Sequence, residues 1–288
     1  MTRPSISVVL IVHNGERFLA EAIQSVFDQT LRPAELLVVD DGSTDDTPAI
    51  IEEARRRDPA FVRLLRHARG RNRGMSRTRN LGLAAARGAF TTFLDHDDVM
   101  LPDKLRTLAA ALEAEPDAIA AVGPNRRWLS WDGGEDGTQD LGGASGRLLP
   151  PPGTLETSLC DSRAVPLGPL IRTDAARSFG GYSEAFPGMH EDQAFFARLM
   201  LHGPIVLVDD VLHLYRQHGD SCVARIHHQG RDKLARRRFL RWLQDDLDRR
   251  PTPQPELQRL VASELEETRG WLRRRLQRIL INLRRRDR

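Results

Sequence analysis

Two clusters of carboxylates, about fifty residues apart, are the side chains of this sequence best suited to do chemistry. One cluster, Asp40-Asp41, follows the apolar residues 35–39, and the other, within residues 95–98, follows the strand-like residues 88–94. An apolar run that ends abruptly in carboxylates is typical of a buried parallel strand whose carboxyl end opens into a ligand crevice. Neighbouring buried carboxylates repel unless a cation or hydrogen-bond donors compensate them. The clusters therefore predict a bound ligand, and a metal ion is the first candidate.

The segments around the clusters alternate between strand-like and helix-like patterns, which predicts one α/β domain with appended elements. Strands are expected over residues 6–12, 35–39, 61–65, 88–94, 118–122 and 167–172, with a closing pair of short strands at 205–208 and 211–215. Helices are expected over residues 18–27, about 46–57, 76–86, from 101 onward, and 191–201. Residues 133–153 are rich in Gly and Pro and are predicted to form a long loop. Such loops in compact domains are commonly functional or disordered.

The net charge of +3 conceals an asymmetry along the chain of 288 residues. From residue 225 onward there are 19 Lys and Arg against 9 Asp and Glu, whereas residues 1–224 have 24 against 31. The sequence thus predicts an acidic domain over 1–224 and a basic helical tail over 225–288. A general nucleic-acid-binding surface is not expected on the acidic domain.

Cysteine use and hydropathy bear on the compartment. Cys160 and Cys222 are the only cysteines and lie far apart, so neither a disulfide framework nor a cysteine metal site is expected. No apolar run approaches the ~20 residues of a membrane span, and residues 1–4 lead directly into a strand without a signal-peptide pattern. We therefore expect a cytoplasmic protein, with peripheral contact at the inner face of the membrane as the alternative.

The joint order of several short motifs resembles the nucleotide-sugar domain of family 2 glycosyltransferases, which has the GT-A fold with a Rossmann-like, mostly parallel sheet. The resemblance runs over residues 5–221, about three quarters of the chain. Each motif alone is weak, and their order and spacing together are specific. The motifs occupy residues 7–14, 40–45, 72–74, 79–82, 93–98, 180–182, 191–199 and 215–221.

The resemblance implies which side chains hold a nucleotide-sugar donor. These are Val12, Asn14, Asp40, Asp41, Arg73, Arg79, Asp95, His96 and Asp97. Asp41 is expected to contact the nucleobase, typically uracil, because a carboxylate accepts a hydrogen bond from the ring N–H. The simpler alternative is that Asp41 forms a turn that caps the next helix. For Arg73 and Arg79 the alternative is solvated surface, since the stretch around them is dense in arginine.

The resemblance further implies a Mn²⁺ or Mg²⁺ site that neutralises the diphosphate, since these ions prefer oxygen ligands shared with phosphate. Asp97 is the expected direct ligand, with Asp98 supporting it and His218 completing the site. The alternatives are a solvated acidic loop and a structural histidine.

The implied activity is inverting transfer of a sugar from a nucleoside-diphosphate donor, expected to be a UDP-sugar, to an acceptor hydroxyl. Asp192 is the expected general base and Glu191 the substitute. Two carboxylates at the start of a helix also have a simple explanation in the helix dipole. The acceptor is a glycan, a lipid-linked sugar or a small molecule, and the sequence does not distinguish these.

Two rival functions remain at this stage. Residues 94–99 fit the Asp-x-Asp-x-Val nucleophile motif of haloacid-dehalogenase-like phosphatases. Those enzymes usually carry it on their first strand, however, and have no use for the upstream Asp40-Asp41. A non-catalytic nucleotide-sugar-binding module is the second rival, favoured if Asp192 lies away from the metal pocket. Nicotinamide binding is disfavoured because no Gly-x-Gly-x-x-Gly follows the first strand.

The basic tail has two apolar stripes at helical spacing, within residues 239–247 and 271–283, each flanked by arginines. An interfacial helix on anionic lipid has this pattern. A helix packed on its own domain or on a second copy in a homodimer has it too. The sequence favours packing or dimerisation and leaves membrane contact open.

Overall fold

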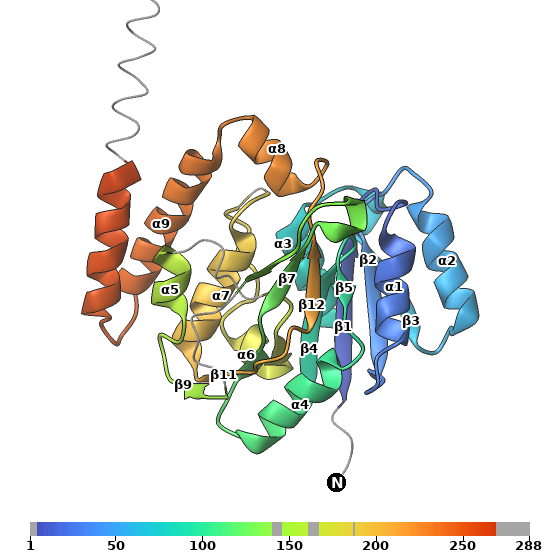
Figure 1. Ribbon diagram of the computed structural model, residues 1–288, viewed down its shortest axis with the longest axis horizontal. Helices are drawn as coiled ribbons and strands as arrows, with labels where there is room; N and C mark the ends of the chain where they lie inside the picture. The colour runs from blue at the N-terminus through green and yellow to red at the C-terminus, as the bar shows by residue number, and fades with distance from the viewer. Residues whose placement is uncertain (1–4, 140–145, 161–166, 187, 269–288) are drawn as a thin grey trace, which may run out of the picture. The chain divides into compact units, whose positions relative to one another are not determined.

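The computed structural model describes residues 5–139, 146–160, 167–186 and 188–268, which fall into two compact units (Figure 1). Unit 1 comprises Met1–Ser221 and unit 2 comprises Cys222–Arg288. The resemblance also implies a division of residues 1–224 into a nucleotide-sugar half, about 1–123, and an acceptor half, about 124–224, and this division stays a prediction.

Unit 1 is built on an eight-stranded sheet with the order β3-β2-β1-β4-β10-β6-β11-β9. Its strands are β1 (Ile6–Val12), β2 (Glu35–Asp40), β3 (Val62–Arg66), β4 (Phe90–Asp95), β6 (Ala120–Val122), β9 (Leu148–Leu149), β10 (Leu170–Arg172) and β11 (Ile205–Leu207). The pairs β3-β2, β2-β1, β1-β4 and β6-β11 are parallel, while β10 runs antiparallel between β4 and β6. The prediction of a mostly parallel sheet is confirmed.

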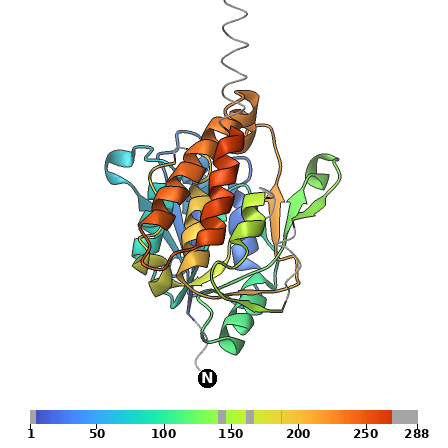
Figure 2. The ribbon, with the colours of Figure 1, turned by 90° about the vertical axis from the view of Figure 1, so that its left-hand side faces the viewer.

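Helices cover both faces of this sheet (Figures 1 and 2). They are α1 (Leu19–Phe27), α2 (Thr47–Arg57), α3 (Met75–Ala85), α4 (Lys104–Ala114), α5 (Leu155–Cys160), α6 (Thr173–Ser178) and α7 (Glu191–His202), with short 3₁₀ turns η1 (Ala68–Gly70) and η2 (Ser130–Asp132). Alternate residues of β1, such as Val8 and Leu10, enter one core with Leu19 of α1 and Leu105 of α4. Val9 points to the opposite face, where it meets α3 at Gly82. This alternation follows from the two-residue period of a strand.

A second sheet of four short strands, in the order β5-β12-β7-β8, lies within the same unit. Its strands are β5 (Val99–Met100), β7 (Asn125–Trp128), β8 (Gly137–Gln139) and β12 (His213–Arg216). The sequence prediction that residues 205–208 and 211–215 form one closing pair is therefore wrong. The apolar β11 is buried and joins the main sheet, while β12 pairs with β5 directly after the second acidic cluster.

The predicted loop over residues 133–153 contains the short strands β8 and β9, and its residues 140–145 lie outside the described residues. Short strands escape a pattern search because two or three residues show no period.

Unit 2 consists of helices α8 (Cys222–His228), α9 (Asp232–Asp248) and the helical residues 255–268. The sequence predicts two helices separated by prolines after residue 225, which correspond to α9 and residues 255–268. The short helix α8 is not predicted. Phe239, Leu240, Leu243 and Leu247 of the predicted stripe are buried. Arg237 of α9 donates to Thr268 Oγ1 at 3.0 Å, and Arg236 pairs with Glu264 at 3.3 Å, which joins the last helix to α9. The second predicted stripe, over 271–283, lies outside the described residues.

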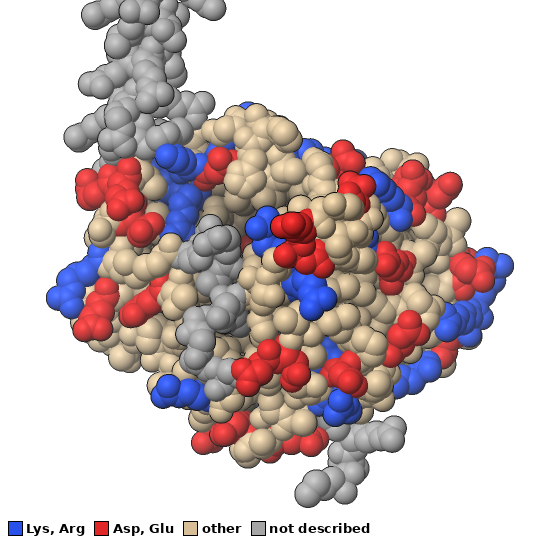
Figure 3. Space-filling view, viewed as in Figure 1, with Lys and Arg blue, Asp and Glu red and all other residues tan. Residues whose placement is uncertain are grey.

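No helix in the described part of the chain combines the length and the apolar character needed to cross a membrane. On the face drawn in Figure 3, acidic and basic side chains are interspersed and do not gather into one basic area.

The close packing of α3 on β1 gives a stability prediction. A Cβ on Gly82 would lie 2.2 Å from Val9 Cγ1 and 3.2 Å from Val39 Cγ2. Ala normally stabilises a helix interior over Gly by about 1 kcal/mol. Here we expect Gly82→Ala to destabilise the protein by about 1–3 kcal/mol, because overpacking outweighs propensity. Urea unfolding measures this change.

Gly137→Ala is the matched control, because nothing lies within 4 Å of a Cβ at that position. A change of under about 0.5 kcal/mol is expected for it. If Gly82→Ala proved as stable as the wild type, the helix would not be held at the strand by this contact.

Candidate active site

The parallel register brings the two acidic clusters to the same end of the sheet, on either side of β1. Val12 pairs with Asp40, and Ile11 pairs with Asp95. Carboxyl ends of parallel strands meet at one edge of a sheet, where ligands bind in open α/β folds. The site residues predicted from these two segments therefore lie around one crevice end.

The first acidic pair is satisfied entirely by the protein. Asp40 Oδ1 accepts from Ser43 N at 2.9 Å and its Oδ2 accepts from Arg66 Nε at 3.0 Å. Asp41 accepts from the backbone N–H groups of Arg73 at 2.6 Å and Gly74 at 2.8 Å. Buried Asp41 thus holds the loop before α3, and the predicted nucleobase contact would use what remains of its acceptor capacity.

Residues at the end of β1 hold the same region together. Val12 O accepts from Asp41 N at 2.8 Å. Asn14, in a left-handed conformation with φ 53°, donates its backbone N–H to Ser43 Oγ at 2.9 Å and accepts from Thr44 N at 2.8 Å. The Arg73 side chain is exposed while its backbone is bound to Asp41. These contacts shape a rim on which a donor ligand can rest.

Arg79 forms a buried link between the acidic loop and α7, and its predicted contact with phosphate or base stays a prediction. Its Nη2 donates to both oxygens of Asp95, at 2.7 and 3.0 Å, and its Nη1 donates to Glu191 Oε1 at 3.1 Å. Its guanidinium also lies 5.2 Å from the ring centroid of Tyr182. Burial opposes the charged form, but Asp95 and the other anionic neighbours outweigh burial and raise the pKa of Arg79. A guanidinium presents a fixed fork of donors, so it can hold two carboxylates at once.

Glu191 and Asp192 open α7, as predicted, after His190 in a left-handed conformation with φ 70°. Glu191 is buried, and burial together with the charge of Asp192 raises its pKa to about 7 against the opposing Arg79. Asp192 is only partly buried, and its Oδ1 accepts from Gln193 N at 2.7 Å. The more accessible Asp192 is therefore the better placed of the two to meet a substrate.

Asp97 and His218 meet, although 121 positions separate them in sequence: His218 Nε2 lies 3.0 Å from Asp97 Oδ2. Burial acts to raise the pKa of Asp97, but the hydrogen bond with His218 and the electrostatic influence of His96 and His218 outweigh burial, and the pKa of Asp97 is lowered. Among the described residues, His218 Nδ1 is buried without a hydrogen-bond partner.

The carboxylate of Asp98 turns into the protein, and its predicted support of a metal ion stays a prediction. Its Oδ2 lies 2.9 Å from His213 Nε2, and its Oδ1 accepts from Arg216 N at 3.0 Å. Burial and the charges of Asp97 and Asp95 raise the pKa of Asp98 well above its usual range. The physical reason is the pairing of β12 with β5, which places two donors beside this carboxylate.

The described residues contain no group of three or more His, Cys, Asp and Glu side chains arranged to hold a metal ion. Asp97 and His218 fit a divalent cation as two protein ligands, since a carboxylate oxygen and an imidazole nitrogen suit Mn²⁺. The remaining ligands would have to come from phosphate oxygens or water, as is usual for ions that bridge a protein and a diphosphate.

Sequence reasoning assigned no role to four buried residues around this site, although the motifs include Tyr182 and Arg216; the other two are Lys104 and His213. Arg216 Nε donates to the carbonyl oxygen of Asp97 at 2.8 Å, and its guanidinium lies 4.1 Å from the ring centroid of Trp128. A signal was present, because Arg216 is two positions from His218 in a recognised motif. Lys104 and His213 interrupt otherwise apolar patterns, which is where functional polar residues are found.

Comparison with known proteins finds a family model and curated relatives that match the first half of the chain. Residues 7–148 match the model of the family described as "Glycosyl transferase family 2". The chain is 39% identical over 117 residues to the succinoglycan biosynthesis protein ExoO of Rhizobium meliloti, covering 41% of this chain and 32% of that protein. It is 31% identical over 128 residues to the glycosyltransferase GlyG of Streptococcus pneumoniae, covering 44% and 41%. In these and two further curated relatives, the matched segment covers between 32% and 41% of the relative's own length.

Solved structures share the fold at low sequence identity. TarS residues 1–349 of S. aureus, in complex with UDP-GlcNAc, align with a TM-score of 0.68 at 20% identity, over 92% of this chain and 71% of that one. The mannosyltransferase PcManGT of Pyrobaculum calidifontis, in complex with GDP-Man and Mn²⁺, aligns with a TM-score of 0.62 at 18% identity, over 92% and 70%. The expected GT-A-like fold is confirmed.

The raised pKa of Glu191 predicts a pH-dependent stability. Because the pKa in the folded state, about 7, exceeds the ordinary 4.5, this group stabilises the fold fully below pH 4.5 and loses that contribution as the pH rises through 7. Glu191→Gln, which stays neutral, should therefore gain stability relative to the wild type between pH 5 and pH 8, by an amount on the order of 1–3 kcal/mol. Urea unfolding at the two pH values measures this change in the difference.

Glu184→Gln is the control, since Glu184 belongs to an exposed pair with Arg77. Its effect should be small and equal at both pH values. A Glu191→Gln effect that did not change with pH would contradict the burial of an ionisable group here.

Proposed function

We propose that this chain, which belongs to glycosyltransferase family 2 through residues 7–148, transfers a sugar from a nucleoside-diphosphate donor to an acceptor hydroxyl with inversion at the anomeric carbon. The observation that carries the proposal is the Arg79 bridge, which ties Asp95 of the acidic loop to Glu191 beside Asp192. Donor-binding and proton-accepting groups thus belong to one connected cluster.

On the donor side, Asp95, Asp97 and His218 are the groups that would face the diphosphate. Asp97 and His218 would hold the divalent cation, which when bound neutralises charge on the leaving diphosphate. Asp95 keeps 40% of its side chain exposed although Arg79 holds it, so it can still accept a hydrogen bond from the donor. The Arg73 side chain, exposed at the rim, adds a cation for the nucleotide.

On the acceptor side, Asp192 would remove the proton from the attacking hydroxyl as the bond to the anomeric carbon forms. Its position at the start of α7 and its partial burial leave the carboxylate accessible. Glu191 is bound to Arg79 and would hold the helix start in register with the donor loop. Direct displacement needs no enzyme nucleophile, so a single base suffices.

The two rival functions have less support. A phosphatase would use Asp95 as a nucleophile, but both Asp95 oxygens accept from Arg79, which lowers their nucleophilicity. A non-catalytic module would be favoured if Asp192 lay far from the donor-binding residues. The contact of Arg79 with Glu191, the neighbour of Asp192, instead supports a position of Asp192 near Asp95.

A UDP-sugar is the donor we propose. The support is the resemblance of TarS, whose structure was solved with UDP-GlcNAc. GDP-mannose, bound in PcManGT with Mn²⁺, is the competing donor. Binding of UDP and GDP to the protein, each with and without Mn²⁺, distinguishes the two.

Separate roles for Asp97 and Asp192 predict separate kinetic defects. Asp192→Asn should lower kcat by about 10²–10⁴-fold, because it removes the general base, and leave Mn²⁺-dependent UDP affinity nearly unchanged. Asp97→Asn should instead weaken that affinity. Calorimetric titration with UDP and a transfer assay measure the two effects.

Asp174→Asn, a fully exposed position at the start of α6, is the matched control and should change neither quantity. Loss of UDP binding in a folded Asp192→Asn variant would refute its role as base. Unchanged binding and turnover in Asp97→Asn would refute the metal assignment.

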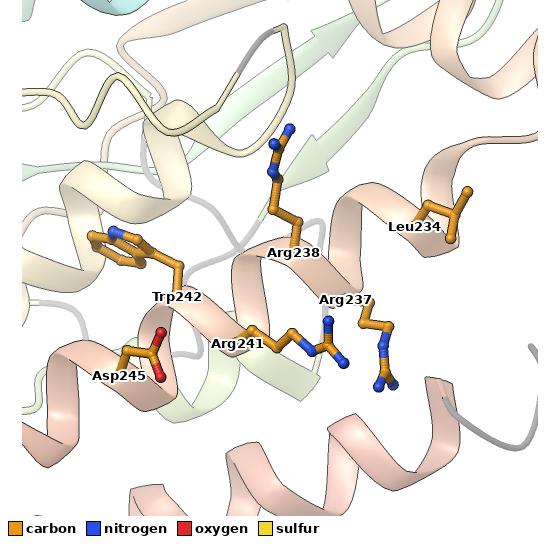
Figure 4. Close-up of a pocket in the computed structure, with 6 residues that line it drawn as sticks. All are labelled: Leu234, Arg237, Arg238, Arg241, Trp242 and Asp245. Carbon is orange, nitrogen blue, oxygen red and sulfur yellow. The ribbon is translucent and has the colours of Figure 1, made fainter.

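For unit 2 we propose contact with an anionic membrane surface at the cytoplasmic face. The apolar stripe of α9 is buried and cannot meet a membrane. A different face of α9 lines a cavity of about 610 Å³ (Figure 4). That face carries Leu234, exposed to 45%, the exposed Arg238 and Arg241, and Trp242, together with the buried Arg237 and the acidic Asp245. Arginines with an aromatic and an aliphatic side chain suit a layer of phosphate headgroups.

The tail proposal predicts sedimentation with vesicles of phosphatidylcholine and phosphatidylserine, and none with phosphatidylcholine alone. Combined Arg238→Glu and Arg241→Glu should reduce binding by at least about tenfold, because each basic residue contributes about 1 kcal/mol near such a surface. The control is Arg55→Glu with Arg56→Glu, which makes the same charge change on exposed α2. The alternative partner is a second copy of the chain. It would be favoured if the wild type did not bind vesicles and light scattering showed a dimer that the two tail substitutions convert to monomer.

A further inference from the structure

Three ionisable side chains form a buried row behind the acidic loop of unit 1. Lys104 Nζ lies 2.8 Å from His213 Nδ1, and His213 Nε2 lies 2.9 Å from Asp98 Oδ2. Their residues are 1%, 2% and 4% exposed, respectively. Lys104 is the first residue of α4 and His213 the first of β12, so three separate elements meet in this row.

The imidazole of His213 links the other two groups. With Lys104 as an ammonium, which only donates, and Asp98 as a carboxylate, which only accepts, the ring accepts at Nδ1 and donates at Nε2. Burial and the charge of Lys104 lower the pKa of His213 well below its ordinary value, so the ring is neutral. The row therefore couples Lys104 to Asp98 through hydrogen bonds without direct contact.

The space around Lys104 is shaped to hold its ammonium group. Gly168 has a φ of 52°, and a Cβ at that position would lie 2.6 Å from Lys104 Nζ. Thr92 Oγ1 donates to the carbonyl oxygen of Gly168 at 3.1 Å and holds this backbone in place. A row of apolar side chains could fill the same volume with equal stability, so the ionic row calls for an explanation beyond stability.

The row is connected to the donor site through β12. The second oxygen of Asp98 accepts from Arg216 N, and Arg216 Nε donates to the carbonyl oxygen of Asp97. Two residues after Arg216, His218 reaches the Asp97 carboxylate. Asp98 thus anchors the strand that carries His218, and the position of His218 relative to Asp97 follows from that anchor.

We propose that Lys104, His213 and Asp98 are positioning residues of the donor site, which set the spacing of Asp97 and His218 and so the affinity for a nucleoside diphosphate with its divalent cation. This inference rests on the proposed function. None of the three touches the donor, and their effect is on binding, not on the chemical step.

The test compares His213→Gln with His213→Leu. A glutamine amide can accept from Lys104 and donate to Asp98, as the imidazole does, whereas leucine can do neither. In a folded His213→Leu variant, Mn²⁺-dependent UDP affinity should fall about 10–100-fold, the effect expected when partners behind metal ligands are removed. The donor KM should rise in parallel while kcat at saturating donor stays within about threefold, and His213→Gln should recover most of the affinity.

His202→Leu is the matched control, because His202 lies at the last turn of α7 and bonds Ser178 at 3.0 Å. It should leave UDP affinity unchanged. A folded His213→Leu variant that binds UDP and Mn²⁺ like the wild type would overturn the inference, as would equal losses in the Gln and Leu variants. Lys104→Met, expected to weaken affinity in the same way, decides the outcome if His213→Leu does not fold.

A ligand-free measurement separates this inference from the proposed function. If the wild-type protein binds neither UDP nor GDP, the proposed function fails. The imidazole ¹⁵N shifts of His218 then report the positioning alone: His213→Leu should move them away from the wild-type values and His213→Gln should restore them. Identical His218 shifts in all three proteins would refute the positioning role.

Discussion

The carboxylates at the carboxyl ends of β2 and β4 must each be compensated, because buried like charges are costly when unpaired. The compensating groups come from elsewhere in the chain. Asp41 is bound by the loop before α3, Asp95 by Arg79, and Asp98 by His213 and the backbone of β12. The electrostatic need of the two strand ends therefore explains why α3, α7 and the second sheet converge at this edge.

This compensation divides the carboxylates into two groups. Asp40, Asp41 and Asp98 are satisfied inside the protein and hold loops and strands in place. Asp95 and Asp97 retain exposed surface, 40% and 20% of their side chains. In the proposed reaction this second group meets the diphosphate of the donor. The inward group would then contribute by fixing the geometry in which the outward group acts.

Arg79 has the corresponding role between donor and acceptor sides. Its two hydrogen-bonding edges face Asp95 and Glu191, so the acidic loop and the start of α7 cannot move independently without breaking a buried ion pair. Buried pairs are costly to break because each leaves an uncompensated charge. A transferase needs the sugar and the base held in one geometry, and this arrangement would supply it.

The sequence by itself determined the parallel sheet, the acidic strand ends and the family resemblance, because strand burial and motif spacing are local properties. It also placed Glu191 and Asp192 at the start of a helix. It placed both Asp97 and Asp98 at the expected metal site, since adjacent aspartates have the same local pattern. That Asp98 turns into the protein was decided by the pairing of β12 with β5, more than a hundred residues apart. The partners of Arg79 were likewise decided by the tertiary structure. The sequence shows only an arginine within an arginine-rich stretch, and the fold brings Asp95 and Glu191 to it.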